Sequence, residues 1–163
     1  MSKIVLITGA TSGFGEATAE RFAQEGYTLI ITGRRKERLD AFKARFPKND
    51  ILALCFDVSD KKAVFEAINA LPPAYKNIDI LVNNAGGGGG GREAPDQITV
   101  DDFIRDFQLN VFAAWRLCQL AAPHMQQAGY GSIINITSMS SINKSPAMSG
   151  YASSKAALNH MGA

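Results

Sequence analysis

The feature that most constrains the fold of this chain is an apolar run that ends in a glycine-rich turn. Residues 3–15 read KIVLITGATSGFG. Ile4–Ile7 are too few to span a membrane, and their branched side chains are typical of a buried parallel strand. Residues 16–24 contain neither proline nor glycine, so a helix should follow the turn. The side chains that could face a sheet from this helix are Phe14, Ala17, Phe22 and Ala23.

The glycine turn between this strand and this helix predicts a nucleotide site. Gly9, Gly13 and Gly15 allow positive φ angles and a close approach of a ligand to the backbone. The helix N-terminus that follows would present free N–H groups and a positive dipole end, which favour a pyrophosphate. The spacing Gly-x-x-x-Gly-x-Gly departs from the usual Gly-x-Gly-x-x-Gly fingerprint, and a simple tight turn is the alternative. The residues predicted to contact the nucleotide here are Thr8, Gly9, Thr11, Ser12, Gly13, Phe14 and Gly15.

The composition is that of an ordinary globular domain. With 46% hydrophobic and 20% charged residues, a chain of 163 residues can bury a core of its own, so a single domain over residues 1–163 is expected. A net charge of +2 is too small to favour nucleic acid or a membrane as a partner. Cys55 and Cys118 form no Cys-x-x-Cys motif and lie in apolar stretches, which predicts two buried thiols, no metal site and a reducing compartment. Because a strand begins at residue 4 without a signal peptide before it, a cytoplasmic protein is expected.

The end of the second strand carries information on the type of nucleotide. Gly26 should end the first helix, and the apolar residues 27–32 then complete a βαβ unit with a right-handed crossover. A fold that binds NAD usually places an acidic residue at this strand's tip, whereas this chain has Arg34 and Arg35. Two guanidinium groups suit a 2′-phosphate, which favours NADP (NADPH) over NAD. The alternative is a pair of solvated charges at a helix start, although cations there oppose the helix dipole.

Alternating apolar and helical segments continue along the rest of the chain. Further strands are predicted at residues 51–56, 78–82 and 132–137, and further helices at residues 37–46, 63–71 and 100–128. This order predicts an α/β fold, a Rossmann-type doubly wound parallel sheet of five strands in the order 3-2-1-4-5.

A second motif, at the end of the fourth strand, supports a family assignment. Residues 83–86 read Asn-Asn-Ala-Gly, which in isolation could be an Asx turn. Together with the turn at residues 8–15, this motif resembles the short-chain dehydrogenase/reductase family. In that family the Asn side chains tie neighbouring loops together, and the resemblance implies cofactor contacts from Asn84, Ala85 and Gly86. It also implies that Asp57 contacts the adenine ring and that its neighbour Val58 contacts the cofactor. For Asp57 the alternative is a turn or cap residue beside Ser59 and Asp60.

The same resemblance implies a catalytic tetrad in the second half of the chain. Ser138 ends the fifth strand, Tyr151 follows 13 residues later, and Lys155 lies one helical turn beyond Tyr151. The resemblance makes Tyr151 the acid and base, Ser138 a donor to the carbonyl oxygen, Lys155 a cofactor ligand, and Asn110 the holder of a relay water. Tyrosine ordinarily titrates near pH 10, so about 4 kcal/mol of phenolate stabilisation is needed at neutral pH, to which a fixed ammonium contributes. A hydrogen-bonded helix Asn and a tyrosine beside a solvated lysine are the alternatives.

Six consecutive glycines, Gly86–Gly91, form the one low-complexity segment of the sequence. We expect a flexible loop near the substrate, with a disordered connector as the alternative. The resemblance also changes here. Residues before this segment are most similar to NADP-dependent reductases of short β-hydroxy acids, whereas residues 83–157 are closer to bacterial hydroxysteroid dehydrogenases, so a hybrid or engineered origin stays open.

These observations lead to two hypotheses about function. The first is an NADP(H)-dependent oxidoreductase that transfers hydride between nicotinamide and a secondary alcohol or ketone, and the second is a nucleotide-binding fragment without turnover. The second hypothesis rests on length, because only eight residues follow Lys155, and the family's sixth and seventh strands and substrate lid would be missing from a C-terminally incomplete domain. An apolar edge at Ile133, Ile134 and Ile136 then predicts self-association or a longer polypeptide. A homo-oligomer, dimer or tetramer, is expected, with Trp115 and Met125 serving in packing or at a subunit interface.

Overall fold

The computed structural model describes residues 2–88, 94–143 and 146–162. Its centre is one sheet of five parallel strands in the order β3-β2-β1-β4-β5, which confirms the predicted order. The strands are β1 Ile4–Ile7, β2 Thr28–Gly33, β3 Ile51–Cys55, β4 Ile80–Asn83 and β5 Ser132–Asn135. The chain runs outward from β1 to β3 and then returns to place β4 on the other side of β1. The strand order therefore reverses between β1 and β4, where ligands bind in open parallel sheets.

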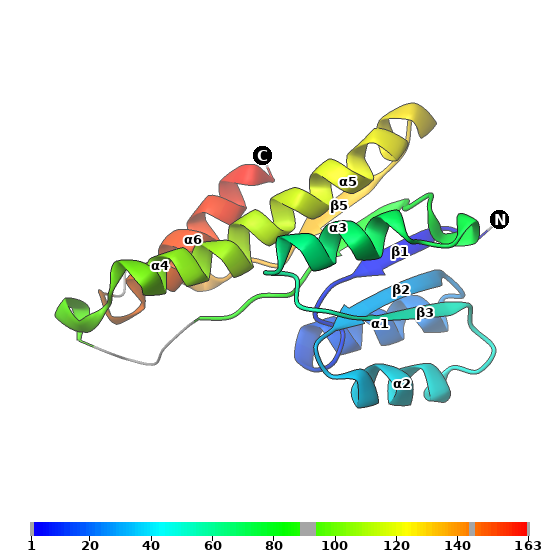
Figure 1. Ribbon diagram of the computed structural model, residues 1–163, viewed down its shortest axis with the longest axis horizontal. Helices are drawn as coiled ribbons and strands as arrows, with labels where there is room; N and C mark the ends of the chain where they lie inside the picture. Colours follow the sequence, from blue (N-terminus) through cyan, green and yellow to red (C-terminus); the bar gives the residue numbers. More distant parts are fainter. Residues whose placement is uncertain (1, 89–93, 144–145, 163) are drawn as a thin grey trace.

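Helices cover both faces of the sheet (Figure 1). The α-helices are α1 Gly13–Gln24, α2 Lys36–Arg45, α3 Lys61–Asn69, α4 Val100–Phe107, α5 Ala113–Ala128 and α6 Ser149–Met161. α1 and α2 pack on one face of the sheet, and α3 and α5 pack on the other. α6 lies beside α4 (Figure 1). None of the helices in the described ranges has the length and hydropathy that crossing a bilayer requires.

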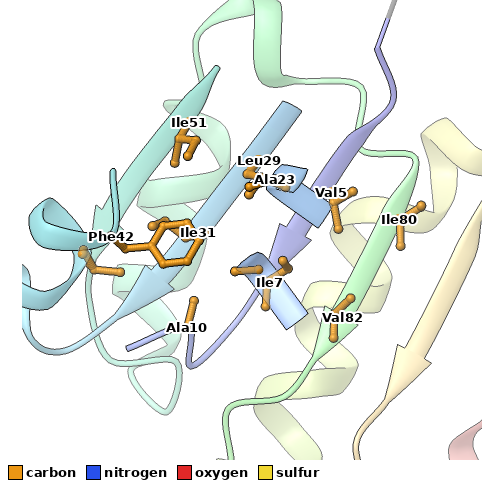
Figure 2. Packing of buried hydrophobic residues seen from close by; sticks show 12 residues of the cluster. Val5, Ile7, Ala10, Ala23, Leu29, Ile31, Phe42, Ile51, Ile80 and Val82 are labelled. Carbon is orange, nitrogen blue, oxygen red and sulfur yellow. The ribbon is translucent and has the colours of Figure 1, made fainter. Parts of the chain in front are cut away.

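Two of the inner strands, β1 and β2, contribute much of the core. Figure 2 shows Val5 and Ile7 of β1 beside Leu29 and Ile31 of β2, and none of these four side chains is exposed. Phe42 of α2 lies over the same face. Because alternate residues of β1 and β2 pack on opposite faces, the strands are apolar throughout, as a sheet covered on both sides requires. The buried strands fix the position of the loops that follow their carboxyl ends.

The long helix predicted at residues 100–128 is interrupted. Five residues, Gln108–Phe112, form a π-helical segment between α4 and α5. Such a segment adds one residue to a turn and occurs frequently at functional sites. Here the segment carries Asn110, whose side chain is only 1% exposed. The prediction of one continuous α-helix over residues 100–128 is therefore wrong at the segment that carries Asn110.

Three side chains lie on the surface where the sequence predicted burial, and one of them is Ala17, which is exposed on α1 while Ala19 and Ala23 are buried. Phe14 is 81% exposed, because the first turn of α1 projects beyond the carboxyl ends of the strands and has no sheet beneath it. Cys55 is exposed, because it ends the edge strand β3. Cys118 is partly buried, and burial raises the pKa of its thiol although Asn83 donates a hydrogen bond to Sγ. Apolar surroundings in the sequence therefore predicted the position of Cys118 better than that of Cys55.

Candidate active site

A cleft of about 1050 Å³ opens at the carboxyl ends of the strands. Most of the predicted site residues line it. On the side of the glycine turn these are Gly9, Thr11, Ser12, Phe14, Arg34, Arg35, Asp57 and Val58, and on the other side Asn84, Ala85, Gly86, Ser138, Tyr151 and Lys155. Four predicted residues, Thr8, Gly13, Gly15 and Asn110, do not line the cleft. The fold thus brings together residues that are up to about 146 positions apart, from Gly9 to Lys155.

Thr8 and Asn84 join the glycine turn to the loop that follows β4. The buried Thr8 hydroxyl accepts hydrogen bonds from the backbone N–H groups of Asn84 (3.1 Å) and Ala85 (2.9 Å). The Asn84 side chain donates in return to the carbonyl oxygens of Thr8 (3.0 Å) and Gly9 (3.1 Å). Gly9 has a φ of +68°, and a Cβ there would lie 2.9 Å from the Ala85 Cα. The two loops are therefore tied together by polar contacts that leave no space for a side chain at residue 9.

The three glycines of the turn differ in their roles. Gly13 has a φ of +57°, whereas Gly15 lies within α1 and its φ is not positive, so the predicted left-handed conformation of Gly15 is wrong. Gly15 is required for a different reason. A Cβ at this position would lie 2.2 Å from the Gly9 carbonyl oxygen. Close packing of α1 against the turn therefore excludes any side chain at residue 15.

Two arginines that follow β2 line the cleft, and only Arg35 contacts the glycine turn. Arg35 Nη2 donates hydrogen bonds to Thr11 Oγ1 (2.8 Å) and Ser12 Oγ (2.9 Å). Arg34 Nη1 lies 3.8 Å from Asp57 Oδ2, and the Arg34 side chain is 79% exposed. The two guanidinium groups therefore stand at the mouth of the cleft, one already oriented by hydroxyl groups and one close to a single carboxylate.

Asp57 forms a turn with Ser59, as the alternative to a cofactor contact predicted, and it also lines the cleft. Its Oδ1 accepts hydrogen bonds from the Ser59 backbone N–H (2.9 Å) and from the Ser59 hydroxyl (2.7 Å). Burial alone would raise the pKa of Asp57, but the hydrogen bonds from Ser59 and the charge of Arg34 outweigh it and lower the pKa. The carboxylate is thus held ionised in an Asx turn, and an additional contact with adenine stays a prediction.

Ser138 is positioned by the short helix Met139–Ser141 that follows it. The Ser138 side chain accepts a hydrogen bond from the Ser140 backbone N–H at 3.1 Å. The Ser141 hydroxyl donates to the Ser138 carbonyl oxygen. Because an oxygen lone pair of the Ser138 hydroxyl is engaged in this way, its hydrogen is available to donate to an acceptor in the cleft.

Tyr151 and Lys155 lie on the same face of α6. Lys155 Nζ is 5.9 Å from the centre of the Tyr151 ring and donates to the Ile136 carbonyl oxygen at 2.8 Å. The Lys155 side chain is 4% exposed, and this burial lowers its pKa below the ordinary value of 10.5. The lysine is therefore a buried ammonium next to a tyrosine, and the alternative of a solvated lysine is wrong.

Asn110 lies behind the cleft and holds the start of the glycine run. Its Oδ1 accepts a hydrogen bond from the Gly87 backbone N–H (3.0 Å), and its Nδ2 donates to the Gly87 carbonyl oxygen (2.9 Å). A Cβ at Gly86 would lie 2.8 Å from Asn110 Oδ1 and 2.9 Å from Lys155 Nζ. No hydrogen bond joins the side chains of Asn110 and Lys155, both of which the structure describes, so the water relay stays a prediction. Gly89–Gly91, the rest of the predicted flexible loop, lie outside the described residues.

Sequence reasoning missed two residues of this arrangement. Gly33 packs so closely against Thr11 that a Cβ would lie 2.4 Å from its methyl group. Ser154 is fully buried and hydrogen-bonded to Asn110. A small polar residue between Tyr151 and Lys155, on the buried face of a helix, was the available signal for Ser154. Within the described part of the chain, no group of three or more His, Cys, Asp or Glu side chains could hold a metal ion.

Comparison with known proteins agrees with this geometry. A family model described as short chain dehydrogenase matches residues 3–163. The chain belongs to the short-chain dehydrogenase family. Among curated members of this family, it is 40% identical over 139 residues to a serine 3-dehydrogenase of Agrobacterium fabrum, which is 85% of this chain and 55% of the relative. It is 41% identical over 135 residues to an NADP-dependent 3-hydroxy acid dehydrogenase of Escherichia coli, which is 83% of this chain and 54% of the relative.

A solved short-chain dehydrogenase structure has the same fold. The closed form of a serine dehydrogenase complexed with NADP+ aligns with a TM-score of 0.90 at 35% identity, covering 97% of this chain and 63% of that one. The chain thus spans about 55% of the length of the curated relatives it matches.

Proposed function

We propose that this chain forms the NADP(H)-binding and catalytic part of an oxidoreductase that interconverts a secondary alcohol and a ketone. The observation that carries the proposal is that Ser138, Tyr151 and Lys155 line the same cleft as the glycine turn. A hydroxyl donor, a phenol and a buried ammonium side by side are what proton transfer at a carbonyl oxygen requires. The fold and the family membership support this reading of the cleft.

The residues of the cleft fit a dinucleotide with a 2′-phosphate. Gly9 lets the turn approach the loop after β4, and Gly15 lets α1 pack against the turn, since a Cβ at either position would clash with backbone atoms. The first turn of α1 then offers backbone N–H groups to a pyrophosphate. Arg34 and Arg35 would hold the 2′-phosphate, aided by the Ser12 hydroxyl that Arg35 already contacts. Two relatives, an NADP-dependent dehydrogenase and an NADP+ complex, favour the same cofactor. When bound, the nicotinamide supplies the hydride or accepts it.

The chain's own side chains would manage the proton. Tyr151 would donate its phenolic proton to the carbonyl oxygen during reduction and take a proton from the alcohol during oxidation. Lys155 would stabilise the phenolate, because a positive charge inside a dry site is screened little by solvent. Ser138 would donate a hydrogen bond to the same substrate oxygen, since Ser140 already occupies one of its lone pairs. Asn110 would hold the loop after β4 in place and, with a water molecule, connect Lys155 to solvent.

The substrate class and the assembly are proposed more coarsely. A hydroxy acid is favoured by the name of the E. coli relative, and a hydroxysteroid-like substrate by the resemblance of residues 83–157. A homo-oligomer is favoured by apolar side chains on the outer surface of α4, the π segment and α5. These exposed side chains are Val100, Ile104, Phe112 and Trp115.

A steady-state assay combined with a binding titration tests the proposal. The purified chain is assayed with NADPH and NADH against a panel of ketones and keto acids, and the binding of each cofactor is measured separately. NADPH-dependent reduction is expected. Tight NADPH binding without turnover of any ketone would favour the alternative, a nucleotide-binding fragment, and the absence of any binding would exclude both.

A further inference from the structure

The inner face of α6 carries a polar side chain to which the catalytic reading gives no role. Ser154 lies on the same helical turn as Tyr151 and Lys155, and none of its surface is exposed. Its hydroxyl donates a hydrogen bond to the Tyr151 carbonyl oxygen at 2.7 Å. The same hydroxyl accepts a hydrogen bond from Asn110 Nδ2 at 2.9 Å. Both the hydrogen of this buried hydroxyl and a lone pair are therefore used.

Ser154 completes a chain of hydrogen bonds that crosses three segments of the protein. The chain starts at the backbone of Gly87, which is held by both ends of the Asn110 amide. It continues from Asn110 to Ser154 and ends at the carbonyl group of Tyr151. Two side chains, Asn110 of the π-helical segment and Ser154 of α6, thus connect these two segments to each other and to the loop after β4.

The chemistry of this position excludes most other residues. Alanine would leave the second N–H of Asn110 Nδ2 buried without its acceptor and would release the Tyr151 carbonyl from its additional donor. Larger side chains would have to displace the packing around a site with no exposed surface. The turn of α6 that contains Ser154 also carries the phenol of Tyr151 and the ammonium of Lys155. The position of this turn therefore sets how the two groups face the cleft.

We propose that Ser154 is a positioning residue for Tyr151 and Lys155, holding the turn that carries them in register with Gly87 through Asn110. This inference rests on the proposed oxidoreductase function. Reaction rates are sensitive to displacements of catalytic groups by about 1 Å. A loosened turn therefore lowers turnover and weakens the stabilisation of the Tyr151 phenolate by Lys155, while the surfaces that bind the adenine half of the cofactor stay unchanged.

The test compares Ser154→Ala with Ser153→Ala, the same substitution at an exposed position of the same helix. Ser154→Ala is expected to lower kcat by about tenfold to a hundredfold. Its Kd for NADPH should stay within about twofold of the parental value, because one hydrogen bond away from the cofactor is lost. Ser153→Ala should match the parent in both quantities. Equal kcat values in the two variants would overturn the proposal.

The pH dependence of alcohol oxidation separates positioning from a merely structural role. If Ser154 positions the lysine next to the phenol, the pH at which kcat reaches half its maximum should move upward in Ser154→Ala. If the serine only stabilises the fold, the whole profile falls in proportion to the folded fraction and its midpoint stays where it was, which would also overturn the proposal.

A second variant covers the case in which Ser154→Ala does not fold. Ser154→Cys retains a similar shape with a weaker donor and acceptor, so it should fold and show a smaller loss of kcat with the same upward shift of the midpoint. A Ser154→Cys enzyme with the parental profile would refute the positioning role. A parental chain that binds NADPH but reduces no ketone would instead count against the proposed function. In that case hydrogen exchange at the Lys155 backbone amide would still test whether Ser154 holds this turn of α6, and exchange is expected to be faster in Ser154→Cys.

Discussion

The ammonium nitrogen of Lys155 lies 5.9 Å from the centre of the Tyr151 ring, one helical turn further along α6. In this arrangement the lysine donates to the Ile136 carbonyl oxygen rather than to the phenol. The charge is therefore fixed by the residue that follows β5 and acts on the tyrosine through space. An ammonium that is held in this way favours the phenolate without being consumed by a direct ion pair.

Removal of the phenolic oxygen should abolish most turnover. Tyr151→Phe is expected to lower kcat by about 10² to 10⁴, the usual contribution of a general acid or base, and to leave the Kd for NADPH nearly unchanged. Tyr130→Phe is the control, because Tyr130 lies outside the cleft, where it stacks under Lys3. Steady-state kinetics with a good ketone and a fluorescence titration measure the two quantities. Parental turnover by Tyr151→Phe would rule out the role given to this residue.

Removal of a guanidinium group from the end of β2 should change the cofactor preference. Arg34→Ala is expected to weaken NADPH binding by about tenfold to a hundredfold, since a charge-assisted contact contributes about 1.5 to 3 kcal/mol, and to affect NADH little. Arg21→Ala is the control, because Arg21 pairs with Glu25 on the surface of α1. Isothermal titration with both cofactors measures the effect. Equal losses for NADPH and NADH would contradict the assignment of Arg34 to the 2′-phosphate.

Replacement of the buried lysine should increase stability while it impairs function. Burial lowers the pKa of Lys155 below 10.5, so the unfolded chain binds this proton more tightly than the folded chain. The cost of burying the charge is fully present below the folded pKa and disappears as the pH rises toward 10.5. Each unit of depression corresponds to about 1.4 kcal/mol. Lys155→Met should therefore raise the free energy of unfolding at pH 7 and bind NADPH less tightly.

The pH dependence of this stabilisation checks its cause. The difference in unfolding free energy between Lys155→Met and the parent, from urea titrations, should shrink between pH 7 and pH 10.5. Lys62→Met, at an exposed position of α3, should show no such trend. A Lys155→Met protein that is less stable than the parent at pH 7 would mean that the hydrogen bond to Ile136 outweighs the cost of burial.

The exposed edge of the sheet should promote association. Within the described residues β5 pairs with β4 alone, and Ile133 and Ile134 are 40% and 39% exposed. Unpaired backbone groups beside apolar side chains recruit other strands. We expect the 163-residue chain to self-associate and Ile134→Lys to reduce its average mass in light scattering, whereas Ala17→Lys, at an exposed position of α1, should leave the mass unchanged. A stable parental monomer would contradict this prediction.

Much of the fold could be predicted because it depends on local patterns. The apolar strands and the glycine turn predicted the parallel sheet and its order, and both were confirmed. Element boundaries and interruptions were less accessible. The π-helical segment at Gln108–Phe112 was not predicted, because its residues continue the apolar pattern of the helices on either side. Phe14 and Cys55 were misplaced for a related reason, since the sequence records how apolar a segment is but not whether the sheet extends beneath it.

The sequence alone determined which chemical groups this protein has and how far apart they are along the chain. The four-residue spacing of Tyr151 and Lys155 predicted that both lie on one face of a helix. The arginines after the second strand, where NAD-binding folds carry an acidic residue, predicted the preference for NADP. Only the tertiary structure decided which of these groups hydrogen-bond to one another. Arg35 is held by the hydroxyls of the glycine turn, and Ser154 connects Asn110 to Tyr151. The contacts of Arg35 with the turn and of Asn110 with Ser154 join residues 23 to 44 positions apart, and they form because polar groups of the packed chain must find partners wherever the fold supplies them.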